Sequence, residues 1–318
     1  MSGVTGDATV GRRGGLRRLA LTYLKPYRWP IAGALLLLGA QAIANLYLPT
    51  LNADIIDNGV VKGDARHILV VGGVMLGVTL AMGATAVFSV WLAARSSMAF
   101  GRDLRSALFR RVESFSQMEL NRIGTHSLIT RATNDVQQVQ MVALLGLTMM
   151  AMAPIMGIGG LILALRINRR LSLSLAVILP IMAGFVGLVT SRALPLFRAM
   201  QVKIDRINRV MRETLAGIRV IRAFDRTEAD QRRFAEANTD LTDTSLRVTR
   251  LFALVMPGIM LVLNLSMTAV MWFGSRLVGN GDMLIGDLTA FLTYLMHILF
   301  SVLMATMMFV VVPRAAAS

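Results

Sequence analysis

Long apolar blocks alternate with long polar stretches along the chain. Six of the apolar blocks hold about 20 residues or more, which is the length that an α-helix needs to cross the hydrocarbon core of a bilayer. The predicted membrane spans are residues 31–51, 68–94, 142–165, 171–191, 251–278 and 288–312. The pattern therefore predicts an all-α integral membrane protein.

Two polar stretches, residues 95–140 and 192–250, separate the second span from the third and the fourth from the fifth. Both are rich in arginine with interspersed acidic residues, and neither contains the proline and glycine clusters that end helices. We therefore expect the flanking spans to continue into water as helices. Because an α-helix rises about 1.5 Å per residue, about 20 further residues would project about 30 Å from the membrane.

The composition supports a membrane location. Hydrophobic residues make up 55% of the 318 residues and charged residues only 16%, and the mean hydropathy is +0.62. Soluble domains carry about 25% charged residues. Most of this chain must therefore face something other than water.

The N-terminus is predicted to have two parts, a flexible basic segment at 1–15 and an amphipathic helix at 16–30. Apolar residues recur in the second part at the spacing of one helix face: Leu16, Leu19, Ala20, Tyr23, Leu24 and Tyr27. Such a helix lies on the membrane surface ahead of the first span. The alternative is a cleaved signal peptide, because a basic start and an apolar core precede Ala40-Gln41-Ala42.

The distribution of basic residues predicts the orientation in the membrane. The N-terminal segment and both long polar stretches hold most of the arginines, and an even number of spans places them on the same side as the C-terminus. The positive-inside rule assigns that side to the cytoplasm, so we expect a protein of the cytoplasmic membrane with both termini inside. Arg166, Arg169 and Arg170 then fall on the outer side, against the rule.

Several kinds of chemistry are excluded by what the sequence lacks. There is no cysteine, the three histidines lie in three different regions, and none of the three lysines follows a glycine as a P-loop requires. We therefore expect this chain to bind no metal or cofactor and to carry no catalytic site. The net charge of +15 lies between apolar spans, which indicates anionic lipid headgroups and excludes nucleic acid as a partner.

Polar residues inside the predicted spans are candidates for a substrate cavity. They are Gln41, Asn45, Asn264 and His297. Two alternatives stay open, namely hydrogen bonds between helices and, for the histidine, a carrier driven by an ion gradient. Gly73 and Gly77 have the spacing of a close helix contact.

Distinct motifs lie in the two polar stretches. The first reads Gly-Arg-Asp-Leu-Arg-Ser-Ala-Leu-Phe at 101–109, Phe-Ser-Gln-Met-Glu at 115–119 and Ser-Leu-Ile-Thr-Arg-Ala-Thr-Asn-Asp-Val at 127–136. The second reads Glu-Thr-Leu-Ala-Gly-Ile-Arg-Val-Ile-Arg-Ala-Phe at 213–224, and Gly-Asp-Leu-Thr-Ala-Phe follows at 286–291. With these motifs after the second and fourth spans, nearly the whole chain resembles the transmembrane domain of ABC exporters, in particular the bacterial heterodimeric multidrug-type half-transporters.

The resemblance implies how the polar stretches would work. Each would bend at a short coupling helix, near 116–122 and 223–229, that docks on a nucleotide-binding domain. The residues it assigns to this coupling are Glu119, Gly124, Arg131, Asp135, Glu213, Gly217, Phe224 and Glu228. ATP and Mg would be bound by that domain, and their binding would switch the membrane helices between inward-open and outward-open states.

The resemblance also implies partners. A second transmembrane half would complete the cavity, in a heterodimer, and the fourth and fifth spans would cross over to it. An amphipathic or lipid-like substrate would move outward through this cavity. An inactive or regulatory membrane module is the alternative function.

The expected domain boundaries follow from the spans. Residues 31–313 form the predicted transmembrane domain, and 314–318 are expected to begin a linker to an ATPase domain that the sequence does not contain. Such a domain would have to come from a continuation of the chain or from a separate partner. A fragment, a truncated product and a complete subunit are all compatible with this expectation.

Overall fold

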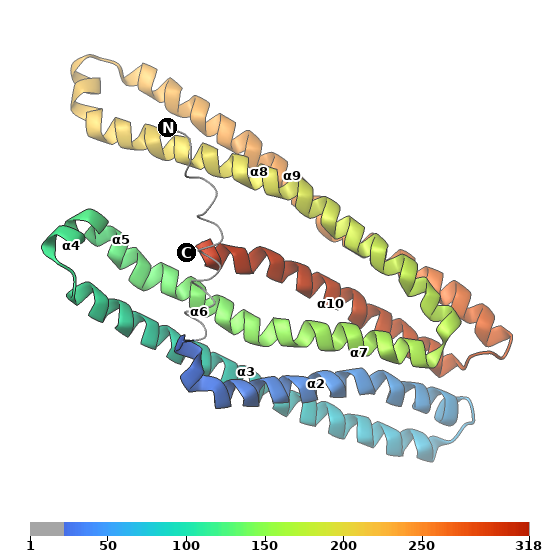
Figure 1. Cartoon of the computed structure of the whole chain (residues 1–318). Helices are drawn as coiled ribbons and strands as arrows, with labels where there is room; N and C mark the ends of the chain where they lie inside the picture. Colours follow the sequence, from blue (N-terminus) through green and yellow to red (C-terminus); the bar gives the residue numbers. More distant parts are fainter. Residues whose placement is uncertain (1–21, 318) are drawn as a thin grey trace, which may run out of the picture. The chain divides into compact units, whose positions relative to one another are not determined.

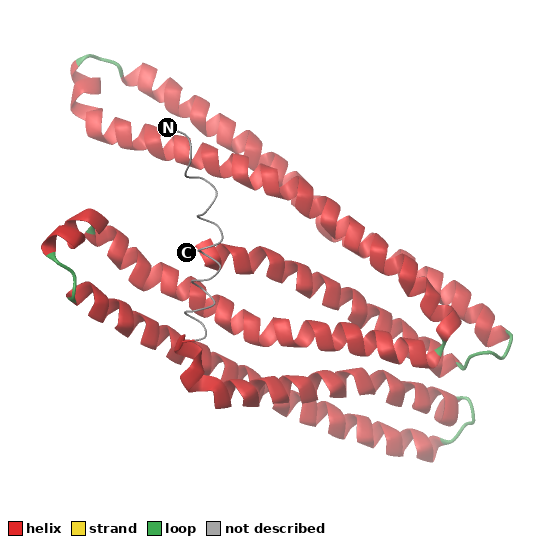
Figure 2. Ribbon diagram, viewed as in Figure 1, coloured by secondary structure: helices red, strands yellow, loops and turns green. Residues whose placement is uncertain are grey.

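The computed structural model describes residues 22–317, which are helical apart from short connections and contain no strand (Figures 1 and 2). The predicted flexible segment 1–15, residues 16–21 of the predicted amphipathic helix and residue 318 lie outside the described residues. Residues 22–24 are helical, and the 3-10 turn η1 (Lys25–Tyr27) leads directly into the first long helix.

Five long helices carry most of the membrane-spanning sequence. They are α2 (Arg28–Asp54), α3 (Ala65–Glu113), α8 (Arg169–Ala223), α9 (Thr227–Gly279) and α10 (Ile285–Ala317). The remaining span is assembled from shorter pieces: α5 (Thr125–Thr130), η3 (Arg131–Asp135), α6 (Val136–Leu145), η4 (Gly146–Met150) and α7 (Ala151–Ile167). Within the described residues, six segments are long and apolar enough to cross a membrane, which confirms the predicted spans.

The predicted extensions beyond the bilayer are confirmed. Helices α3, α8 and α9 contain 49, 55 and 53 residues, far more than the roughly 20 residues that a bilayer requires. At about 1.5 Å per residue, α8 is about 80 Å long. Each polar stretch thus forms the two arms of a helical hairpin.

The chain divides into two compact units. Unit 1 contains the described residues up to Leu175 and from Ala269 onward, and unit 2 contains Ala176–Thr268. In unit 1, α10 packs against α2 and α7, and its fully buried Tyr294 donates a hydrogen bond of 2.9 Å to the carbonyl of Leu46 on α2. The same hydroxyl lies 2.7 Å from Oγ1 of Thr50, so a polar contact fixes the register of these helices.

Glycines on α7 allow this close packing. A Cβ atom at Gly160 would lie 3.0 Å from Cγ1 of Ile298, and one at Gly157 would lie 2.6 Å from Oγ of Ser301. Gly73 and Gly77 behave differently, since a Cβ at either would meet no atom of the described chain within 4 Å. Their spacing on α3 therefore corresponds to no close helix contact within these residues, because no neighbouring helix reaches that face.

Unit 2 contains most of the hairpin formed by α8 and α9, including the turn that joins them. The rings of Phe197 and Phe252 meet edge to face with centroids 5.6 Å apart. A Cβ at Gly258 would lie 2.7 Å from Cε2 of Phe185. The two helices therefore hold each other through aromatic contacts, of which the one between Phe185 and Gly258 lies within the predicted spans.

Candidate functional site

The first hairpin ends in a short helix. Helix α4 (Gln117–Ile123) follows α3 and ends at Gly124, whose φ of +82° favours glycine. The resemblance places a coupling helix at 116–122, and the structure has a separate helix at that position. Met118, on its first turn, is 79% exposed, so the tip has an apolar side chain on its surface.

Glu119 caps the start of this helix as part of a capping box. The backbone N–H of Ser116 donates to Oε2 of Glu119 at 2.8 Å, and the backbone N–H of Glu119 donates to Oγ of Ser116 at 3.3 Å. The Ser116 hydroxyl also donates to the carboxylate at 2.9 Å. Hydrogen bonds from the Ser116 backbone and hydroxyl lower the pKa of Glu119 below its ordinary value. Glu119 is therefore an ionised cap on an exposed tip.

Arg131 and Asp135 lie on the returning arm of this hairpin, not at its tip. They are the first and last residues of η3, a π-helical segment between α5 and α6. Arg131 is exposed and Asp135 is half-buried. One turn of helix separates them, so they share one face of this arm.

A polar cluster joins the N-terminal segment to the base of the first hairpin. The Tyr27 hydroxyl donates to Oδ2 of Asp103 at 2.5 Å and accepts from Nη2 of Arg102 at 3.1 Å. Beside it, Tyr23 and Leu24 pack against a buried apolar cluster of α3 and α6. Sequence reasoning missed this connection, because no motif pairs residues 76 positions apart.

A second cross-connection links the two arms of the first hairpin. The buried Gln140 on α6 accepts a hydrogen bond of 2.9 Å from Nη2 of Arg105 on α3, and its amide contacts Sδ of Met98. A Cβ at Gly101 would lie 2.8 Å from Cδ of Gln140. Glycine is therefore needed at position 101 so that the glutamine side chain can lie between the helices.

The second hairpin ends in a tight turn. Helix α8 ends at Ala223 and α9 begins at Thr227. The N–H of Arg226 donates to the carbonyl of Ile221 at 2.9 Å and that of Asp225 to Arg222 at 3.3 Å, a Schellman arrangement in which Asp225 takes a φ of +50°.

The expectation of a separate coupling helix at 223–229 is wrong for this structure. That stretch contains the end of α8, a three-residue turn and the first turn of α9. The Schellman bonds reverse the chain at once, and the acidic Glu228 and Asp230 favour a new helix N-terminus directly afterwards. Phe224 is 75% exposed at the turn, and Glu228 pairs with Arg232 at 2.9 Å on α9.

Contacts between α8 and α9 brace the second tip. Glu213 forms an ion pair with Arg233, and the hydroxyl of Thr214 donates to Oδ2 of Asp230 at 2.8 Å. Gly217 lies one turn nearer the tip, where a Cβ would just reach Ile221 at 4.0 Å. Glu213 thus has a structural partner within the chain in addition to its predicted coupling role.

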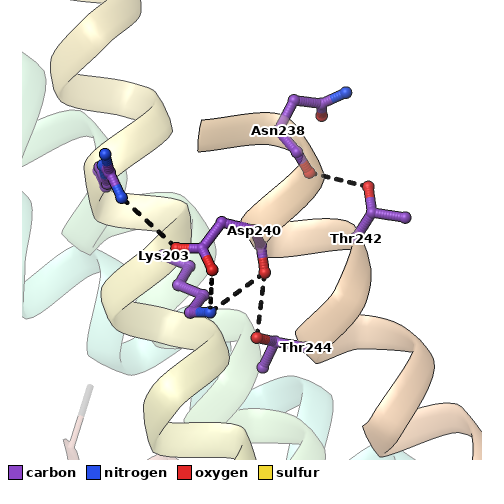
Figure 3. A network of polar contacts seen from close by, with 6 residues as sticks. Lys203, Asn238, Asp240, Thr242 and Thr244 are labelled. Atoms are coloured by element: carbon purple, nitrogen blue, oxygen red, sulfur yellow. Dashed lines mark hydrogen bonds and ion pairs between the residues drawn. The ribbon is translucent and has the colours of Figure 1, made fainter. Parts of the chain in front are cut away.

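A larger polar network holds the arms farther from the tip (Figure 3). Lys203 on α8 donates to the Oδ1 of Asp240 at 2.5 Å and to its backbone carbonyl at 3.2 Å. Arg206 approaches the same carboxylate at 3.4 Å, and Thr244 donates to the same carbonyl at 3.1 Å. Lys203 is the one lysine in the arginine-rich stretch 192–250. This difference from its neighbours is the sequence signal that could have indicated its contact with Asp240.

The candidate cavity residues are distributed over both units. Gln41 and Asn45 are half-buried one turn apart on α2, and His297 is half-buried on α10, which packs against α2. Asn264 belongs to unit 2, where it is exposed and its amide donates to the carbonyl of Met260 at 2.8 Å within α9. This bond of Asn264 stays within its own helix, so it is not the bond between helices that the alternative interpretation expects.

In the part of the chain that the structure describes, histidine and acidic side chains do not gather into a metal site. Among the described residues, no group of three or more such side chains could hold an ion. At the end of α2, Asp54 accepts from Asn58 at 2.6 Å and lies 3.0 Å from Nε2 of His67. These contacts hold the segment between α2 and α3 against the start of α3.

Comparisons with known proteins agree with this membrane-spanning architecture. The family model of the ABC transporter transmembrane region matches residues 31–303. An ABC transporter ATP-binding protein of Mycobacterium tuberculosis is 44% identical over 301 residues, which are 95% of this chain and 52% of the relative.

Two further relatives are similar over shorter or less identical alignments. An ABC transporter ATP-binding protein of Bacillus subtilis is 36% identical over 299 residues, 94% of this chain and 52% of the relative. An ATP-dependent lipid A-core flippase of Pseudomonas putida is 29% identical over 200 residues, 63% of this chain and 33% of that protein. The chain thus spans about half the length of the first two relatives.

Proposed function

The chain belongs to the family of ABC transporter transmembrane regions, and from this premise we propose that it is the membrane-spanning half of an ATP-driven exporter. It moves an amphipathic or lipid-like substrate outward across the cytoplasmic membrane by alternating access. The observation that carries the proposal is the pair of long helical hairpins with exposed, locally fixed tips, at Met118 and Phe224. The flippase relative supports a lipid-like substrate.

The hairpins suit the transmission of movement. Their arms are continuous with membrane-spanning helices, and side chains brace them at Arg105–Gln140, Glu213–Arg233 and Lys203–Asp240. A braced hairpin moves as a rigid lever, so a displacement at the tip reaches the bilayer without being absorbed by bending. In the proposed complex, a nucleotide-binding domain that holds ATP and Mg displaces both tips.

The proposed complex needs a second transmembrane half, in a heterodimer. Large apolar side chains are exposed on α8 and α9, including Val177 at 62% and Leu254 at 68%. In the proposed arrangement, these helices cross over to the second half and both termini lie in the cytoplasm. The half-buried polar residues Gln41, Asn45 and His297 then line the shared cavity together with Asn264.

Substitutions at two of the proposed coupling residues test the proposal in the chain joined to, or purified with, its nucleotide-binding domain in proteoliposomes. We expect Glu119→Ala and Glu213→Ala to lower substrate-stimulated ATP hydrolysis about fivefold, the lower end of typical coupling energies. Glu236→Ala, at another exposed glutamate of the second hairpin, is the matched control and should leave stimulation unchanged.

A further variant separates a docking contact from helix capping. Glu119→Gln keeps the capping geometry, since glutamine also serves at this position, but it removes the charge. Loss of stimulation in this variant supports a contact with the nucleotide-binding domain. Full stimulation in all three variants would exclude Glu119 and Glu213 from coupling. Transport that needs no ATP but collapses with a protonophore would favour the ion-gradient carrier.

A further inference from the structure

The side of unit 1 opposite the α4 tip carries an open basic groove. It has a volume of about 760 Å³ and lies at the junction of α7, α8 and the loop before α10, within the range of about 300–1,000 Å³ that ligand sites occupy. Its charged residues are Arg166, Arg169, Arg170 and Asp282. We propose that this groove binds the headgroup of an anionic phospholipid.

The charge balance of the groove favours an anion. Three guanidinium groups meet one carboxylate, and the one pair among them is loose, since Nη1 of Arg170 lies 3.7 Å from Oδ2 of Asp282. The side chain of Arg170 is 81% exposed, and Arg166 and Arg169 are also exposed. Guanidinium groups bind phosphate oxygens with two parallel hydrogen bonds, so these side chains are suited to a phosphodiester.

The apolar part of the groove favours a lipid over a free phosphate. Ile162 and Leu165 line it with exposed fractions of 48% and 43%. They occupy the last turns of α7, directly before the arginines. An acyl chain along this ledge would place its phosphate at the level of the guanidinium groups.

Nearby residues mark this level as the membrane boundary. On the last turns of α9, the guanidinium of Arg276 lies 5.2 Å above the ring of Trp272, which is 61% exposed. Tryptophan and arginine gather where hydrocarbon meets headgroups. Asn168 fixes the turn between α7 and α8 by accepting a hydrogen bond of 3.1 Å from the Leu171 N–H. The three arginines of the groove therefore have a defined position at this boundary.

The inference also accounts for three arginines that oppose the positive-inside rule. Binding to anionic headgroups offsets the unfavourable position of these charges. The existence of the groove depends only on the membrane-spanning fold. Its assignment to the outer leaflet rests on the proposed orientation and function.

Native mass spectrometry of the 318-residue chain with defined lipids tests the proposal. Phosphatidylglycerol should bind more tightly than phosphatidylcholine, and a triple variant Arg166→Gln, Arg169→Gln, Arg170→Gln should lose about fivefold in this preference for each arginine that contacts the headgroup. The corresponding triple lysine variant should retain most of it. Asp282→Asn should raise it, since the competing carboxylate is neutralised.

Controls distinguish the groove from general positive charge. Arg66→Gln and Arg276→Gln remove other exposed arginines and should leave the preference unchanged. An unchanged preference in the triple glutamine variant, or an equal loss in the controls, would overturn the site. Displacement of phosphatidylglycerol by an equal concentration of inorganic phosphate would overturn the lipid assignment, and none of these readouts depends on transport.

Discussion

Single residues determine how the first hairpin is held together. Gly101 leaves room for the Gln140 side chain, which in turn accepts from Arg105. Glu119 accepts from the backbone N–H of Ser116 at the tip, a donor that the helix itself leaves unpaired. Gly101 and Glu119 both act through local geometry, which a substitution can change without altering the hydrophobic pattern.

Gly101→Ala is expected to destabilise the chain by about 1–3 kcal/mol, because the new methyl group displaces Gln140 from between the helices. Gly77→Ala on the same helix α3 is the matched control. A methyl group there meets only open space within the described chain, and helix propensity favours alanine by about 1 kcal/mol. Thermal unfolding in detergent measures both, and equal effects would contradict the packing argument.

The cap at Glu119 should depend on pH. Its pKa is lowered in the folded chain, so the stabilisation is complete above the ordinary value of 4.5 and is lost as the pH falls through the lower folded value. Hydrogen exchange, corrected for its intrinsic pH dependence, should show α4 losing protection only below pH 4.5. Glu119→Gln should abolish this step, and a step that persists in the variant would assign it to another group.

The ends of the long helices determine where the chain reverses. The first hairpin turns through the separate helix α4, whereas the second turns within three residues after α8. The difference arises at the helix ends. Ser116 begins a capping box in the first hairpin, and Asp225 completes a Schellman motif in the second.

Asp225→Gly should stabilise the second turn by about 0.5–1 kcal/mol, because glycine takes a positive φ without steric cost. Asp225→Val should destabilise it by about 1–2 kcal/mol, since a β-branched residue is disfavoured in that region. Hydrogen exchange at the amide of Arg226, which donates to Ile221, reports the change. Opposite signs for the two variants are the expected result, and a common sign would contradict the left-handed conformation.

At the scale of the whole molecule, the spans and the positions of the tips predict a topology. The chain contains no cysteine, so single cysteines can be introduced at exposed positions without background. Met118 and Phe224 lie at the two tips, and Lys62 lies in the connection between α2 and α3.

A membrane-impermeant maleimide should label Met118→Cys and Phe224→Cys from the same side and Lys62→Cys from the other. Intact cells and inverted vesicles provide the two sides, and the proposed orientation predicts labelling of the tips only in inverted vesicles. Labelling of the tips in intact cells would reverse the orientation. Labelling of the two tips from different sides would contradict six spans.

The sequence by itself determined the features that depend on local interactions. Apolar length predicts each span because a helix satisfies its own backbone in lipid, and the absence of proline and glycine clusters in 192–250 predicts the extended arms of α8 and α9. The resemblance also indicated a helix at the first tip. These features require no knowledge of which helix lies beside which.

Only the tertiary structure decided the contacts across helices. Gly157 and Gly160 are packed closely whereas Gly73 and Gly77 are not, and Lys203 meets Asp240 from 37 positions away. Such pairs depend on the rotation and register of neighbouring helices, to which the apolar pattern is nearly indifferent, because a lipid-facing side chain and a packed one are equally hydrophobic.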